Sequence, residues 1–395
     1  MNRHLDIFLN ALRLGCTSFG GPAAHLGYFH KAYVERNRWL DEARFSDIVA
    51  LCQFLPGPAS SQVGYAVGTL RGGLLGGFLA WLGFTLPSAV LMIAFALGLA
   101  QRGDLGGAAW LRGLKIAAVA VVADAVWRLG ARLCPDAPRR TVALLAAMGM
   151  LLATAAWMQL VLLAAGAVVG AIGFRALVQP GPAPDQPVVT SRPRPRLGAA
   201  ALIVFGGLLL ALPVIAVETG SRVAEIFDSF YRAGSLVFGG GHVVLPLLQT
   251  GVVEPGWVDA DRFLAGYGAA QALPGPLFAF AAYLGASFRE APSGIAGGIL
   301  ALVAIYLPSW LLVTGILPFW DRLRRVPSAQ AMLLGTNAVV VGLLLAALYD
   351  PVWRVAIHGP RDVVVLLLAA GLLFVAKAPA WAVVLVAAGA GQLLL

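Results

Sequence analysis

Long apolar runs recur along the whole 395-residue chain and limit its fold more than any other feature. Most reach the roughly 20 residues that a helix needs to cross a hydrocarbon core of about 30 Å. Hydrophobic residues make up 59% of the sequence and charged residues only 12%, about half the charged share of a soluble domain, so lipid must be the solvent for most of the chain. The predicted spans are residues 46–69, 74–99, 108–127, 141–157, 159–178, 198–217, 263–287, 294–317, 328–348, 362–376 and 379–395.

The formal net charge is +9. In a membrane protein such an excess is expected in loops that face the anionic cytoplasmic leaflet, and no basic patch interleaved with aromatic residues points to nucleic acid. Cys16, Cys52 and Cys134 are odd in number and lack metal-ligand spacing. No hydrolase, metalloprotease or P-loop motif is present. We therefore expect a protein that is not an enzyme and has no cofactor, metal or nucleic-acid partner.

The N-terminus does not resemble a signal peptide, because Asp6 and Arg13 interrupt its short apolar run. We expect a multi-pass protein of the bacterial inner membrane, with the lipid bilayer as its surroundings. A homodimer is compatible with the sequence.

The chain contains an internal duplication whose offset drifts only from 218 to 221 residues. In the first half the repeated elements are Arg13 with Gly20 and Gly21, then Trp39, then Gln53 with Pro56-Gly57-Pro58, and then Leu86-Pro87-Ser88. Their counterparts in the second half are, in the same order, Arg232 with Gly239 and Gly240, Trp257, Gln271 with Pro274-Gly275-Pro276, and Leu307-Pro308-Ser309. We divide the chain into a first repeat at 1–178, a proline-rich linker with a connecting transmembrane helix at 179–221, and a second repeat at 222–395.

The connecting helix sets the relative orientation of the two halves. If each half has about six membrane segments, one extra crossing turns the second half upside down. We therefore predict an all-α polytopic membrane protein with inverted repeats, an architecture common among secondary transporters. The distribution of basic loops agrees only partly, because the basic loop at 31–44 would lie outside.

Two further segments, at 8–28 and 227–248, are apolar but interrupted by glycine clusters. The sequence leaves open whether they span the membrane or re-enter it. A helix that restarts after such a break points free N–H groups and a positive dipole end at the gap, which suits an anion. The alternative is close helix packing through small residues. We favour the anion site because the break occurs in both halves.

Arg13 and Arg232 each lie seven residues before a glycine pair. A central membrane arginine costs about 2.5–3.5 kcal/mol, and a guanidinium suits a tetrahedral oxyanion, although snorkelling to the interface is the alternative. The predicted substrate-binding residues are Arg13, Ser18, Gly20, Gly21, Gln53, Gly57, Gln62, Arg232, Gly239, Gly240, Gln271 and Gly275. Gln62 belongs to the first half alone, because Phe280 occupies its counterpart.

Three residues are candidates for proton coupling: His25, His242 and Asp124. Histidine titrates near neutral pH. The alternatives are structural histidines and an ion pair between Asp124 and Arg128, which are four residues apart on a helix.

Taken together, these motifs resemble the chromate ion transporter family in its long, two-domain form. The resemblance rests on Arg13 with Ser18-Phe19-Gly20-Gly21-Pro22, on Trp39 and Phe45, on Gln53 with Pro56-Gly57-Pro58, on Arg71-Gly72, and on Leu86-Pro87-Ser88. It implies two homologous domains in opposite orientations, export of chromate from bacteria, and chromate resistance. Val237 and Gly241 depart from Ser18 and Pro22, so substrate contacts there could be one-sided. The alternatives are a transporter for sulfate or another oxyanion, and an anion channel.

Overall fold

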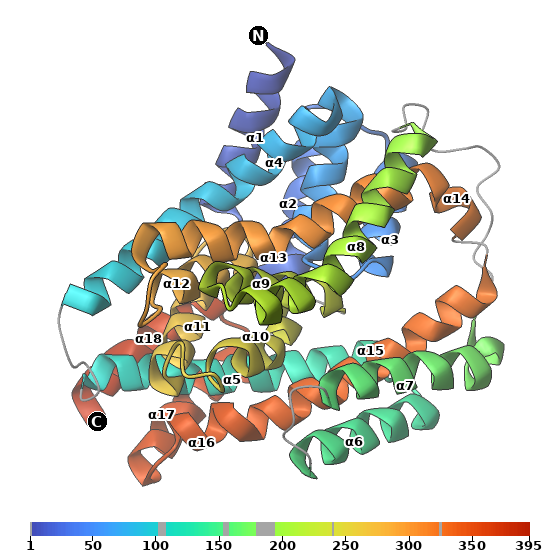
Figure 1. The fold of residues 1–395 in the computed structure, drawn as a ribbon. Helices are drawn as coiled ribbons and strands as arrows, with labels where there is room; N and C mark the ends of the chain where they lie inside the picture. Colours follow the sequence, from blue (N-terminus) through green and yellow to red (C-terminus); the bar gives the residue numbers. More distant parts are fainter. Residues whose placement is uncertain (1, 102–107, 153–157, 179–193, 239–240, 324–325) are drawn as a thin grey trace.

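The structure is a computed structural model that describes residues 2–101, 108–152, 158–178, 194–238, 241–323 and 326–395. Every regular element in these ranges is a helix, so the predicted all-α class is confirmed (Figure 1). Four helices are long and apolar enough to cross a membrane: Ala59–Gln101, Pro195–Thr219, Gly294–Phe319 and Pro327–Ala356. Several other predicted spans form shorter helices, such as Met158–Gly173 and Ala380–Leu394.

The first half contains seven α-helices among the described residues. They are α1 (Arg3–Thr17), α2 (Gly21–His30), α3 (Glu42–Phe54), α4 (Ala59–Gln101), α5 (Ala109–Leu133), α6 (Ala137–Leu152) and α7 (Met158–Gly173), with a π-helical segment η1 (Lys31–Arg36) and a 3-10 turn η2 (Arg175–Leu177). α4 is two helices in sequence, because Gly72 and Gly73 leave the helical conformation at a kink.

The connecting helix α8 (Pro195–Thr219) is present where the sequence predicts it. Most of the linker before it, residues 179–193, lies outside the described residues. The second half then comprises α9 (Arg222–Leu236), η3 (Gly241–Val243), α10 (Val244–Val252), α11 (Ala260–Gln271), η4 (Leu277–Ala279), α12 (Phe280–Ala286), α13 (Gly294–Ile316), η5 (Leu317–Phe319), α14 (Trp320–Leu323), α15 (Pro327–Ala347), η6 (Leu348–Trp353), α16 (Arg354–Ala356), α17 (Pro360–Ala370), η7 (Gly371–Val375) and α18 (Ala380–Leu394).

Local sequence explains why matching helices begin at matching positions. Asp41 caps α3 and Asp259 caps α11, and each carboxylate accepts the backbone N–H of the arginine three residues later at 2.8 Å. Such a cap satisfies an amide that the first helical turn leaves free. The duplicated sequence therefore gives duplicated helix starts.

Each half contributes a helical hairpin to the other half. The hairpin of α6 and α7 packs on α15, whereas α17 and α18 pack on α5 (Figure 1). Glycine permits both contacts: a Cβ at Gly335 would lie 2.0 Å from the Gly166 carbonyl oxygen, and a Cβ at Gly113 would lie 2.1 Å from that of Ala387. Close approach through small residues is typical of helices packed in membranes.

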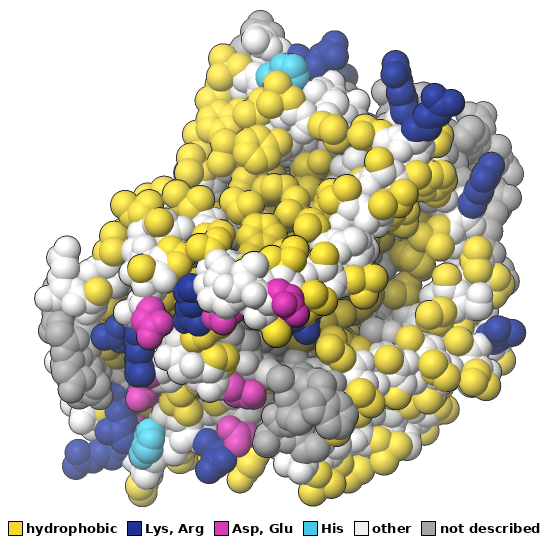
Figure 2. All heavy atoms as spheres, viewed as in Figure 1, with side chains coloured by type: hydrophobic (Ala, Val, Ile, Leu, Met, Phe, Trp, Pro, Cys, Tyr) yellow, Lys and Arg dark blue, Asp and Glu magenta, His cyan; other side chains and the backbone are white. Residues whose placement is uncertain are grey.

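The surface is largely apolar, as expected for a chain solvated by lipid. Figure 2 shows hydrophobic side chains over most of one face, with most basic side chains near its edges. On α8, Ile203, Leu210 and Val217 are 74%, 76% and 81% exposed. α8 packs on α13 and α9 with one side only, so its other side is free to contact lipid.

Candidate functional site

The first predicted helix break is confirmed in the first half. α1 ends at Thr17 and α2 begins at Gly21. Gly20 and Gly21 have φ angles of +97° and +76°, a left-handed conformation that glycine adopts without steric cost. In the second half α9 ends at Leu236, but Gly239 and Gly240 lie outside the described residues.

The Pro-Gly-Pro triplets interrupt the helices of both halves, as predicted. α3 ends at Phe54 and α4 begins at Ala59, while α11 ends at Gln271 and η4 begins at Leu277. Gly57 and Gly275 have φ angles of +119° and +93°.

Two reciprocal hydrogen bonds join these breaks across the two halves. The Gly57 N–H donates to the carbonyl oxygen of Val237 at 2.6 Å, and the Gly275 N–H donates to that of Ser18 at 2.9 Å. Val237 is the counterpart of Ser18. Each Pro-Gly-Pro break is therefore bonded to the glycine-rich break of the opposite half, and the interrupted backbone is paired inside the protein, as a membrane interior requires.

The glycines of both triplets also touch the repeated Leu-Pro-Ser motif of the opposite half. A Cβ at Gly57 would lie 2.5 Å from Ser309 Oγ, and a Cβ at Gly275 would lie 2.9 Å from Ser88 Oγ. Ser88 and Ser309 are themselves counterparts. The pseudo-symmetry thus extends from the backbone to the nearest side chains.

Polar side chains from both halves meet beside the Gly57 break. Gln62 Nε2 donates to the Pro56 carbonyl at 2.6 Å and to Ser309 Oγ at 3.4 Å. Ser61 Oγ lies 3.5 Å from the Tyr306 hydroxyl. The residues around this narrow space are Ser61, Gln62, Tyr65, Trp81, Tyr306, Ser309 and Trp310. We call this group the polar centre. The space is too narrow for a water molecule, so the centre is closed.

Several buried polar atoms at or near the polar centre have no hydrogen-bond partner. They include Ser18 Oγ, Gln62 Oε1, Trp81 Nε1 and Trp310 Nε1. An unpaired buried polar group costs about 1–3 kcal/mol, and native proteins contain few of them. These atoms are therefore free to bind a polar ligand.

The structure places seven predicted residues at or beside the paired breaks: Ser18, Gly20, Gly21, His25, Gly57, Gln62 and Gly275. His25 Nδ1 lies 3.2 Å from Ser60 Oγ, near the start of α4. The sequence did not single out Tyr306 or the two tryptophans, because an apolar helix offers no local signal for them. The repeated Leu-Pro-Ser motif could have identified Ser309.

The other predicted residues lie elsewhere. Arg13 is exposed on α1, Gln53 accepts a hydrogen bond from Arg132 at 3.2 Å, and Gln271 Nε2 has no partner. His242 Nδ1 lies 2.8 Å from the Tyr267 hydroxyl. The predicted ion pair is present, with Arg128 Nε 2.7 Å from Asp124 Oδ1.

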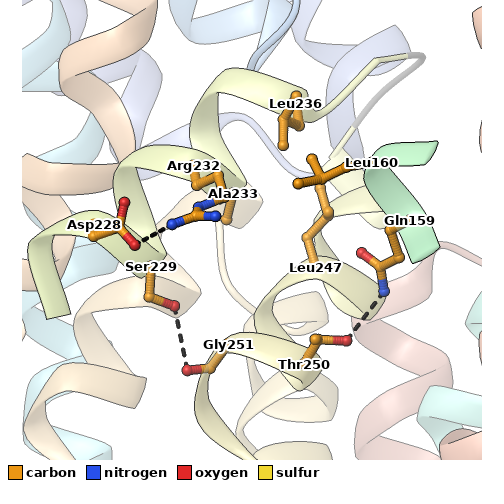
Figure 3. A pocket seen from close by; sticks show the side chains of 10 residues that line it. All are labelled: Gln159, Leu160, Asp228, Ser229, Arg232, Ala233, Leu236, Leu247, Thr250 and Gly251. Atoms are coloured by element: carbon orange, nitrogen blue, oxygen red, sulfur yellow. Dashed lines mark hydrogen bonds and ion pairs between the residues drawn. The ribbon is translucent and has the colours of Figure 1, made fainter. Parts of the chain in front are cut away.

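Arg232 lines a separate cavity of about 340 Å³ (Figure 3). Its guanidinium pairs with Asp228 on the same helix. Gln159 of α7 donates to Thr250 Oγ1 at 3.1 Å on the facing wall. Leu236 also lines this cavity, and the next residue, Val237, is the one that accepts from Gly57. The arginine cavity therefore adjoins the paired breaks along α9.

Within the described ranges, no group of three or more His, Cys, Asp or Glu side chains is placed to hold a metal ion. The arrangement offers hydrogen-bond donors and one paired arginine. Such donors can bind an anion.

Comparison with known proteins matches the chain to one family along most of its length. A family model described as "Chromate transporter" matches residues 5–171 and again 224–392. A "Chromate transport protein" of Pseudomonas aeruginosa is 32% identical, over 87% of this chain and 80% of its own. A "Probable chromate transport protein" of Synechococcus elongatus is 26% identical, over 85% and 81%, and a "Chromate transport protein" of Cupriavidus metallidurans is 25% identical, over 92% and 86%. No solved structure matches the chain.

Proposed function

The chain belongs to the chromate transporter family, and we propose that it is a secondary transporter that exports chromate across the bacterial inner membrane and so gives chromate resistance. A dianion that leaves a negative interior gains about 2 × 2.3 kcal/mol per 100 mV. This equals roughly a 2,000-fold gradient. Export therefore needs no coupling ion, although His25, His242 and Asp124 remain our candidates for proton coupling.

The observation that supports this proposal most is the reciprocal pair of hydrogen bonds from Gly57 to Val237 and from Gly275 to Ser18. In transporters with inverted repeats, the substrate site lies where discontinuous helices of the two repeats meet. We extend the proposal to two inverted halves, 1–178 and 222–395, joined by the segment 179–221. The oxyanion would bind near the pseudo-two-fold axis between them.

The unpartnered donors of the polar centre suit such a substrate. The indole N–H groups of Trp81 and Trp310 are buried and unpaired, and their rings lie 4.5 Å apart between centroids. Neutral donors and helix N-termini can replace the water around an anion without adding a fixed charge. Because the centre is too narrow for water, we assign this structure to a closed stage between two alternating openings.

The remaining predicted contacts complete the proposed path. We propose that Arg13 and Arg232 attract the oxyanion, that Gln53, Gln62 and Gln271 line its route, and that the backbone of Gly20, Gly21, Gly57, Gly239, Gly240 and Gly275 donates hydrogen bonds to it.

The direct test is chromate uptake into everted membrane vesicles, with Arg13→Ala and Arg232→Ala beside the wild type. A charge-assisted hydrogen bond is worth about 1.5–3 kcal/mol, so loss of a contacting arginine should raise the KM roughly tenfold or more. Arg354→Ala is the matched control, because Arg354 is exposed and paired with Asp350 on its own segment.

The outcomes separate the parts of the proposal. Saturable uptake that weakens in either arginine variant supports export through an arginine-lined path. Uptake unaffected by both changes removes the arginines and leaves the helix breaks. Absence of wild-type uptake overturns the chromate assignment, and competition by sulfate identifies a broader oxyanion carrier. A channel would carry current in planar bilayers without saturable counterflow.

A further inference from the structure

The arginine cavity contains one cation and one anion among the described residues that line it (Figure 3). These are Arg232 and Asp228, which lie one helical turn apart on α9 and pair with each other. The side chain of Asp228 is 15% exposed and that of Arg232 is 36% exposed. The rest of the wall consists of leucines, Ala233, Gly251 and the neutral polar groups of Gln159, Ser229 and Thr250.

This ion pair limits what Arg232 can do for a substrate. A partly desolvated guanidinium that loses its carboxylate is left as an uncompensated charge, which is strongly unfavourable. Asp228 pairs with Nη2 of Arg232, and both bidentate modes of a guanidinium use this nitrogen, so a substrate that binds Arg232 bidentately must replace Asp228. A tetrahedral oxyanion can do so, because two of its oxygens match the guanidinium fork. Chloride carries the same single charge as the carboxylate but has only one acceptor atom, so it cannot form two parallel hydrogen bonds with the fork.

The first half has no equivalent pair. The counterpart of Arg232 is Arg13, and the counterpart of Asp228 is Leu9. Leu9 is 42% exposed and carries no charge. The duplication kept the arginine in both halves but placed a carboxylate one turn before it only in the second.

We propose that Asp228 is a tethered counterion that the substrate must displace from Arg232, and that it thereby selects divalent oxyanions over chloride. The inference rests on the proposed function and adds to it a specificity-determining residue. If Asp228 occupies Arg232 about nine-tenths of the time, the apparent affinity of Arg232 for the substrate is about tenfold lower than that of a free arginine. The cavity of about 340 Å³ gives the incoming anion room beside the pair.

The test is Asp228→Asn in everted vesicles. We expect the KM for chromate to fall about tenfold and chloride to become a competitive inhibitor, because Arg232 is then free to bind either anion. Glu225→Gln is the matched control: it removes a carboxylate from the same helix, but that carboxylate pairs with Arg222 at 3.1 Å and lies outside the cavity lining. This control should leave both properties unchanged.

A double-variant comparison separates this role from a structural one. In a protein that already carries Arg232→Gln, the further change Asp228→Asn should have no effect on the KM. Asp228 then has no guanidinium to pair with. An unchanged or raised KM in Asp228→Asn, with wild-type uptake intact, overturns the inference. Asp228→Ser provides a second variant if the asparagine protein does not accumulate.

The inference can be tested even if chromate is not the substrate. Absence of chromate uptake by the wild type would overturn the proposed function. In that case, sulfate binding to the purified full chain, measured by thermal shift, tests the role of Asp228 directly. Tighter sulfate binding by Asp228→Asn supports the tethered counterion, and equal binding overturns it.

Discussion

The segments that follow the two Pro-Gly-Pro breaks share one backbone hydrogen bond but differ in helix type and in side chains. α4 begins with Ala59-Ser60-Ser61-Gln62, whereas η4 and α12 carry Leu277-Phe278-Ala279-Phe280 at the same positions. Both follow a glycine whose N–H is bonded to the opposite half. The duplication has kept the hydrogen bonds that stabilise a break and has changed the chemistry beside it.

The second-half helix is packed with aromatic rings. Phe280 is fully buried, with ring centroids 5.3 Å from Phe263, 5.7 Å from Tyr267 and 6.1 Å from Tyr283. Buried aromatic pairs add about 0.5–1.5 kcal/mol beyond area burial. After the Pro-Gly-Pro breaks, the first half therefore places polar groups and the second half aromatic packing, although Tyr306, Ser309 and Trp310 of the second half also line the polar centre.

The largest expected effect comes from breaking the shared backbone feature. Gly57→Ala and Gly275→Ala both force a Cβ into left-handed backbone, which costs about 1–2 kcal/mol, and each Cβ meets a buried serine. We expect chromate uptake to be nearly abolished in both variants, with Gly57→Ala the more severe because its Cβ also lies 2.5 Å from Gln62 Nε2. Chromate uptake into vesicles measures the loss of transport, and thermal unfolding of the purified protein measures the loss of stability.

Gly27→Ala is the control for these glycines. A Cβ at Gly27 meets nothing within 4 Å, and alanine is a better helix former by about 1 kcal/mol. This variant should keep full uptake. Normal uptake by Gly275→Ala together with loss in Gly57→Ala would show that the second break is not needed, contrary to the symmetric arrangement.

A smaller effect should separate the polar helix from the aromatic one. Gln62→Leu leaves the Pro56 carbonyl without its 2.6 Å donor and removes the bond to Ser309, so we expect uptake to fall roughly tenfold. Phe280→Leu, at the counterpart position, removes ring contacts and should lower the free energy of unfolding by about 1 kcal/mol with little change in KM. Uptake kinetics and denaturation measured on both proteins make the comparison.

Equal losses of uptake in the two variants would contradict a polar role confined to the segment after the first break. Ser229→Ala is the comparison variant for a polar group outside the polar centre. The Ser229 hydroxyl donates to the Gly251 carbonyl at 3.2 Å in the arginine cavity. This variant should change uptake less than Gln62→Leu.

The sequence predicted the features of this fold that depend on local chemistry. Glycine and proline clusters marked where helices break, and the connecting helix was evident from its apolar composition. The exchange of hairpins, in which α7 packs on α15 and α18 on α5, was not predictable. Long-range packing depends on small residues such as Gly335 and Gly113, which look the same in a helix exposed to lipid.

The site was predictable to a similar degree. Gly57 and Gly275 came from the repeat itself, Ser18 came from the family resemblance, and Gln62 stood out as a polar residue in an apolar run. The bonds that join them are between backbone atoms of opposite halves, and no residue pattern encodes which carbonyl a free N–H will reach. Trp81 and Trp310 lack repeat partners, since Leu302 and Ala89 stand at those places, so duplication gave no signal for them.

The smallest expected effect concerns a charged cluster that only the first half possesses. His30 Nε2 lies 2.6 Å from Glu42 Oε2 and its Nδ1 lies 3.2 Å from Glu35, in the predicted loop region, whereas Ala260 replaces Glu42 in the second half. The hydrogen bond with Glu42 raises the pKa of His30 above its usual 6.5.

Because the folded-state pKa is raised, the stabilising effect of His30 is fully present below pH 6.5 and is lost as the pH rises through the raised value. His30→Gln should therefore slightly lower the thermal unfolding temperature at pH 6 and leave it unchanged at pH 9. Glu42→Gln should show the same pH dependence. If His30→Gln lowered the unfolding temperature equally at both pH values, His30 would contribute through packing and not through its charge. The loop of the first half would then differ from that of the second in its contacts and not in its pH dependence.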